Sequence, residues 1–264
     1  QRKIEEASKL LSNGITNASR VKNILALTRA AMDLSLDTAI EHGLRKLRAR
    51  ETEKERIEGL ILEANHLLQR AGKAAAIKVI DTYLSSFKTP VSIARLAELF
   101  ESMGETKRAT GFFKKAWVET ETEDIGLRLA WMLSNSKESK DRDEANQIFR
   151  QIWLQAGSEA RRVQVEERVL DLSARDGTLA DLAVDLEDEL AGPEPEHAET
   201  KRQALIKIYT RARDSIAASL ILDEFGKHPD KRVQALQDKT RMFWECEEFR
   251  NHDRTLRELI DADP

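Results

Sequence analysis

Residues 91–121, VSIARLAELFESMGETKRATGFFKKAWVETE, carry the pattern that decides the fold. Apolar and small residues recur through this stretch at intervals close to one helical turn, which is typical of an amphipathic α-helix. Gly104 divides the stretch in two, because glycine takes the left-handed backbone conformation of a tight turn at little cost. The pattern therefore predicts two antiparallel helices that pack face to face. The facing positions are Ile93, Leu96, Ala97, Phe100, Gly104, Ala109, Phe113 and Ala116.

Read in order, these positions hold a large residue, leucine, a small residue, an aromatic, glycine, a small residue, an aromatic and a small residue. This order resembles the signature of the tetratricopeptide repeat, a family of stacked helical hairpins. The resemblance implies an all-α, right-handed solenoid in which each pair of antiparallel helices buries its face only against the next pair. Residues 91–121 match at every position. Looser matches cover 60–83, 129–152, 209–229 and 243–264, and the signature fades in 15–50 and 158–191.

Helix breakers and capping residues divide the rest of the chain into about fifteen helical stretches. Glycines are expected at helix ends, prolines are expected to stop helices, and Ser or Asp side chains are expected to cap helix N-termini. Residues 134–143, SNSKESKDRD, predict a longer polar loop, whereas Gly43 lies inside a predicted helix without an evident reason. The expected helix ends are Gly14, Gly72, Gly104, Gly177 and Gly226, the stops are Pro90, Pro193, Pro195 and Pro229, and the caps are Ser92, Ser158 and Asp214.

The predicted domain organisation is a single TPR-like solenoid over 1–264. It consists of a leading helix at 3–11 and about seven helical hairpins, with the GPEPE stretch at 192–196 as a candidate bend. The chain begins at Gln1 rather than at methionine, which favours a fragment of a larger protein. No apolar run approaches the roughly 20 residues that span a bilayer, so no membrane insertion is expected.

The charge balance and the cysteine content limit which functions and locations are expected. The 43 basic and 47 acidic residues are interspersed and leave a net charge of -4. Nucleic-acid binding is not expected, because it depends on a basic excess or stripe that neutralises phosphates. Cys246 is the single cysteine, so no disulfide forms within the chain. The location stays open between a reducing cytoplasm and a bacterial periplasm.

No motif predicts catalysis. His42, His66, His197, His228 and His252 are scattered and lack a second ligand at metal-binding spacing. Cys246 lies among glutamates, which raise a thiol pKa rather than activate the thiol. The chain has no glycine-rich phosphate loop and no GxSxG elbow. We therefore expect no enzyme activity, no cofactor and no metal.

The resemblance implies that the first helix of each hairpin lines a concave groove. Projecting the 91–121 register along the chain predicts which residues contact a partner there, and Trp131 and Trp244 stand out because tryptophan is enriched at binding hot spots. Trp117 and Trp153 are expected in the core instead. At the groove positions where family members that bind acidic chaperone tails carry Lys and Asn, residues 91–121 hold Ala94 and Glu98, which argues against such a ligand. The predicted groove residues are Glu98, Glu101, Leu127, Trp131, Asn135, Gln203, Lys207, Gln237, Arg241 and Trp244.

Three functions fit this description. The leading one is a non-catalytic scaffold for protein–protein interaction that binds a partner protein or peptide in the concave groove. A second is the periplasmic repeat arm of a bacterial envelope or exopolysaccharide-export complex, with a glycan as a possible ligand. A third is a regulatory arm of a larger multidomain protein.

Overall fold

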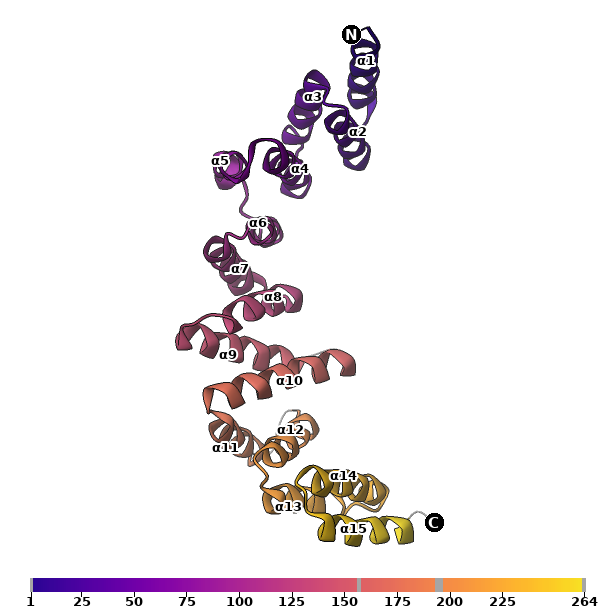
Figure 1. The fold of residues 1–264 in the computed structure, drawn as a ribbon, viewed down its shortest axis with the longest axis vertical. Helices are drawn as coiled ribbons and strands as arrows, with labels where there is room; N and C mark the ends of the chain where they lie inside the picture. The colour runs from indigo at the N-terminus through magenta and orange to yellow at the C-terminus, as the bar shows by residue number, and fades with distance from the viewer. Residues whose placement is uncertain (1, 156–157, 193–196, 263–264) are drawn as a thin grey trace. The chain divides into compact units, whose positions relative to one another are not determined.

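The computed structural model describes residues 2–155, 158–192 and 197–262, and in this part every regular element is helical (Figure 1). The described residues contain fifteen α-helices and two short 3-10 turns, which confirms the expected number of helical stretches. The chain divides into two compact units, Gln1–Met132 and Leu133–Pro264. We describe each unit by itself.

The first unit contains the leading helix, three helix pairs and most of an eighth helix. Consecutive helices pack against each other as α2 with α3, α4 with α5 and α6 with α7, and the leading helix contacts both α2 and α3. Its helices are α1 (Arg2–Asn17), α2 (Val21–Asp33), α3 (Asp37–Arg48), α4 (Glu53–Ala71), α5 (Lys73–Tyr83), α6 (Pro90–Ser102), α7 (Thr106–Thr120) and α8 (Glu123–Ser134), with a 3-10 turn at Leu84–Ser86.

The second unit continues the same alternation of helix and short connection. Here α9 packs against α10, α12 against α13 and α14 against α15, and each of α11 and α13 also contacts the helix that follows it. The helices are α9 (Ser139–Gln155), α10 (Glu159–Asp176), α11 (Leu179–Leu190), α12 (Ala198–Arg211), α13 (Ser215–Phe225), α14 (Arg232–Glu245) and α15 (Phe249–Ala262), with a 3-10 turn at Pro229–Lys231.

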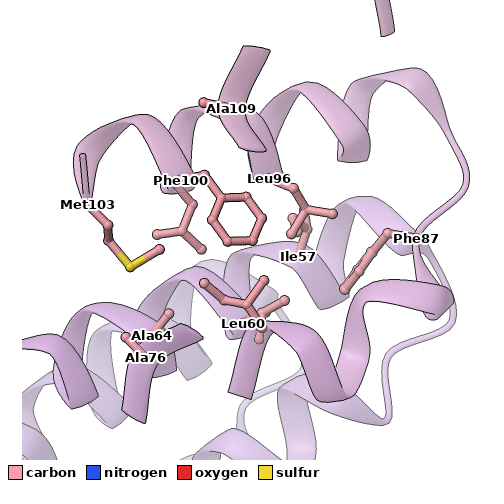
Figure 2. Packing of buried hydrophobic residues seen from close by; sticks show 11 residues of the cluster. Ile57, Leu60, Ala64, Ala76, Phe87, Leu96, Phe100, Met103 and Ala109 are labelled. Atoms are coloured by element: carbon pink, nitrogen blue, oxygen red, sulfur yellow. The ribbon is translucent and has the colours of Figure 1, made fainter. Parts of the chain in front are cut away.

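The best-matching repeat packs as its spacing predicts. Ala97 on α6 and Ala109 on α7 are fully buried, and Gly104 takes a φ of 72° in the turn between the helices. Phe100 is fully buried in a cluster that α4, α5, α6 and α7 share (Figure 2). Such a buried phenylalanine contributes about 2 kcal/mol from its apolar area alone. Small residues where the helices cross therefore allow the large ones beside them to interdigitate.

Several of the predicted helix ends are correct. Gly72 and Gly177 follow α4 and α10 with φ of 85° and 75°, values that favour glycine. The Ser158 side chain accepts a hydrogen bond from the Arg161 amide, and the Asp214 side chain accepts one from the Ala217 amide at 3.0 Å.

Other boundary predictions are wrong. Gly14 lies inside α1, which continues to Asn17 because Ile15 is fully buried and extends the apolar face beyond the predicted end at residue 11. Pro90 opens α6 instead of ending a helix, since the first turn needs no proline amide. Ser92 is therefore a buried residue within that helix rather than its cap.

The loop predicted at 134–143 is also shorter than expected. Helix α8 ends at Ser134 and α9 begins at Ser139, so the polar residues that follow form the first turns of α9. Gly226 follows α13 but keeps a right-handed φ of -71°. Of the candidate bend at 192–196, residues 193–196 lie outside the described residues.

Candidate binding grooves

The second unit has a groove that three helices line. These helices are α10, α12 and α14, and the hollow between them has a volume of about 290 Å³. Its floor is apolar where Ile206 and Met242 approach each other, and its walls carry both positive and negative side chains. The lining residues are Glu167, Gln203, Ile206, Lys207, Thr210, Arg211, Asp238, Arg241, Met242 and Glu245. We call this hollow the second-unit groove.

Ion pairs tie the α10 wall of the second-unit groove to α12. Lys207 Nζ lies 2.7 Å from Glu166 Oε2, and Arg211 Nη1 lies 3.0 Å from Asp171 Oδ1 while it also binds Glu167. The Glu166 side chain is only 6% exposed, and this burial raises the pKa of its carboxyl against the opposing effect of Lys207. These cations are thus engaged with the scaffold itself.

The α14 wall is more open. The Arg241 side chain is 72% exposed, and its guanidinium lies 3.8 Å from Asp238, beyond hydrogen-bonding distance. Burial raises the pKa of the Asp238 carboxyl. Across the groove, the Gln203 amide donates to Glu199 on its own helix at 3.3 Å. Among the cations of this groove, Arg241 is the one most available to a ligand.

The predicted groove residues of the second unit divide into two groups. Gln203, Lys207 and Arg241 line the same hollow, although they come from two different helices. Trp244 points elsewhere: it is 59% exposed and packs against Phe249 on α15, with ring centroids 5.4 Å apart. Gln237 is exposed on α14, whereas its neighbour Asp238 lines the groove. The groove register on α14 therefore follows Asp238, Arg241 and Glu245.

The remaining predicted groove residues lie along α6 and α8. Glu98 on α6 forms ion pairs with Arg95 and with Arg128 on α8, and Glu101 lies 4.0 Å from the same Arg128. Leu127 and Trp131 are half-buried on α8, and Asn135 is exposed just after its end. Trp117 and Trp153 are buried, at 9% and 1% exposure.

The first unit has a groove that the sequence did not indicate. It lies between α2 and α4, with a volume of about 430 Å³. The tetratricopeptide signature is weakest in 15–50, so no register could be projected onto α2. The signal that could have revealed it is an apolar line with polar neighbours on each helix. Leu25, Met32, Ile61 and Leu62 form its apolar part, and Arg29, Asp33, Glu58, Asn65, His66, Gln69 and Arg70 form its polar part.

His66 is one of the polar residues that line this first-unit groove. Burial lowers the pKa of its imidazole, and the positive charge of Arg70 lowers it further. His66 is therefore neutral near physiological pH and offers a ring nitrogen as a hydrogen-bond acceptor. A polar segment with an apolar side is the kind of ligand that such a groove accommodates.

Within the described residues, no group of three or more His, Cys, Asp or Glu side chains is arranged to hold a metal, and no helix is long and apolar enough to cross a bilayer. Cys246 is buried, and burial followed by nearby Glu248 and Glu245 raises the pKa of its thiol. Comparison with protein-family models gives no match, and comparison with curated proteins gives none either.

Proposed function

We propose that the chain is a tetratricopeptide-like repeat protein, a right-handed solenoid of helix pairs, that binds partner proteins without catalysing a reaction. The main support is the second-unit groove, in which α10, α12 and α14 each contribute side chains to one hollow. A surface built from repeated helices suits a polypeptide segment, because a segment contacts several repeats at once.

The charges of this groove favour a polypeptide ligand with an anionic group. Lys207 and Arg211 are held by carboxylates of α10, which offset their charge and leave few of their hydrogen bonds free. Arg241 is exposed and lies beyond hydrogen-bonding distance of Asp238. A carboxylate of the partner can accept two hydrogen bonds from such a guanidinium, and its apolar neighbours can contact Ile206 and Met242.

A quantitative pull-down with a matched pair of variants tests this proposal. Arg241→Glu reverses the charge inside the groove, whereas Gln237→Glu places the same side chain one turn away on α14, at a position that does not line the groove. We expect specific proteins to be retained by the native chain and by Gln237→Glu, and to be lost from Arg241→Glu. Equal retention by both variants would place the binding surface elsewhere. If the native chain retained no protein at all, that result would contradict the scaffold function.

Two alternatives share the same architecture. A periplasmic arm of an envelope or exopolysaccharide-export complex would bring a glycan to the exposed Trp244, and titration with charged glycans would then change tryptophan fluorescence. A regulatory arm would leave the isolated chain without ligands, and its deletion would change the activity of the parent protein. The polar, mixed-charge lining of the second-unit groove supports the polypeptide ligand above these two.

A further inference from the structure

The last helix pair exposes a set of large apolar side chains. Trp244 is 59% exposed, Phe249 53%, Leu256 38% and Ile260 59%. Helix α15 is 14 residues long, and among its described residues only Thr255 is buried. We call Trp244, Phe249, Leu256 and Ile260 the α15 face. Exposed large apolar side chains that gather on one helix pair point to an interaction site.

The side chains of α15 form a pattern that is complementary to itself. Phe249, Leu256 and Ile260 are spaced by seven and four residues, which places them in one stripe along the helix. Asp253 and Arg257 flank that stripe on the same side, one turn apart. When two such helices pack antiparallel about a twofold axis near residue 255, each Phe249 meets Ile260 of the copy, and each Asp253 meets Arg257 of the copy. Every such contact forms twice.

The flanking charges are available for this pairing. Arg257 is exposed and has no ion-pair partner among the described residues. The Asp253 side chain is 69% exposed, with Oδ1 lying 3.2 Å from Nδ1 of its neighbour His252. Opposite charges at matching distances from the twofold axis fix both the antiparallel direction and the register.

We propose that a second copy of this chain docks on the α15 face, with the two α15 helices antiparallel and related by a twofold axis near residue 255. This proposal does not rest on the binding grooves. A contact that consists mainly of one helix and Trp244 from each copy lies at the lower end of interface sizes, so the dimer is weak and its population depends on concentration.

Sedimentation equilibrium of the full 264-residue chain and its charge-swap variants tests the proposal. The native chain is expected to associate reversibly to dimers. Asp253→Arg and Arg257→Asp each place like charges opposite each other twice, so each should weaken the dimer about tenfold. The double variant Asp253→Arg/Arg257→Asp restores opposite charges and should recover the native affinity. A native chain that stays monomeric, or a double variant no better than the single ones, overturns the proposal.

Cross-linking tests the same geometry when charge has little effect. Leu256→Cys places a thiol beside the twofold axis, whereas Glu258→Cys places one on the opposite side of α15. Under mild oxidation, Leu256→Cys should form a disulfide-linked dimer and Glu258→Cys should not; the native chain, whose one cysteine is buried, is the control for background. Equal cross-linking at both positions would mean that association does not use this face.

Discussion

Gly43 on α3 lies so close to Thr28 on α2 that a β-carbon at position 43 would be 2.0 Å from the Thr28 hydroxyl oxygen. Thr28 is fully buried, and its hydroxyl donates to the Ile24 carbonyl at 2.7 Å. A glycine inside a helix costs roughly 1 kcal/mol relative to alanine. Here that cost leaves room for the Thr28 side chain of α2 against the backbone of α3, which explains a glycine for which the sequence offered no reason.

Gly43→Ala should therefore destabilise the first unit, by about 1–3 kcal/mol, because α2 and α3 must separate to admit the methyl group. Chemical denaturation followed by circular dichroism measures the change. Gly111→Ala is the matched control: Gly111 is exposed in α7, and a β-carbon there would meet nothing within 4 Å. We expect this variant to be more stable by roughly 0.5–1 kcal/mol. A stabilised Gly43→Ala would show that the crossing is loose.

The ion pair between the buried Glu166 and the more exposed Lys207 makes the stability of the folded chain depend on pH. Burial raises the pKa of Glu166 in the folded chain, so the folded state binds the proton more tightly than the unfolded state does. The contribution of Glu166 to stability is therefore largest below the ordinary value of 4.5 and falls as the pH rises through the raised pKa. Glu166→Gln should remove this loss, and its unfolding free energy should vary less with pH than that of the native chain.

The same pair gives a second comparison. Lys207→Met removes the cation and leaves a buried carboxyl without its partner, so the variant should lose about 2 kcal/mol at neutral pH. Combining Lys207→Met with Glu166→Gln should recover most of this loss, because neither charge is then left unpaired. If the double variant is as unstable as Lys207→Met alone, packing by the Lys207 stem rather than charge explains the effect.

Tyr209 on α12 should ionise late. Its hydroxyl donates to a carboxylate oxygen of Glu187 on α11, and burial together with that carboxylate raises the pKa of Tyr209 to about 12. Tyr83→Phe leaves Tyr209 as the only tyrosine, so absorbance of tyrosinate reports this group directly. Since the folded pKa lies above the ordinary 10.0, the stabilisation is complete below that pH and is lost as the pH rises toward 12. Adding Glu187→Gln should lower the pKa without returning it to 10.0, because burial remains.

Cys246 should react slowly with thiol reagents. The residue is 7% exposed, so a reagent reaches its sulfur rarely. Burial and the neighbouring Glu248 and Glu245 raise the pKa of its thiol, so little of it is in the reactive thiolate form. Labelling of the native chain should be about 100-fold slower than labelling in denaturant. The rate measures opening of the α14–α15 pair, and rapid labelling of the folded chain would show that this pair opens often.

Local chemistry in the sequence was enough to predict most of the helices. The apolar spacing in 91–121 predicted the α6–α7 hairpin. Gly72, Gly104 and Gly177 marked the ends of α4, α6 and α10, because glycine adopts the left-handed conformation at little cost. The predictions made from Pro90 and Ser92 were wrong for a related reason. Both are compatible with a helix start, and the choice between positions one turn apart depends on which face the helix buries.

The grooves were predicted only in part. Gln203, Lys207 and Arg241 fell in the second-unit groove, but on α14 the groove follows Asp238, Arg241 and Glu245, so the projected register missed it by one residue at Gln237 and Trp244. On the same helices, Trp244 turns toward Phe249 and His252 instead, since a rotation of about 100° per residue moves a side chain to another face. The first-unit groove was missed because the signature is faint in α2.

The sequence by itself determined that this chain is helical, roughly where its helices begin and end, and that consecutive helices pair, because these depend on residues close together along the chain. Only the tertiary structure decided which side chains share a groove, why Gly43 must be glycine, and which apolar side chains remain exposed on α15. Those features depend on how one helix crosses another. A small change in the crossing exchanges one exposed side chain for its neighbour without altering the periodicity that the sequence displays.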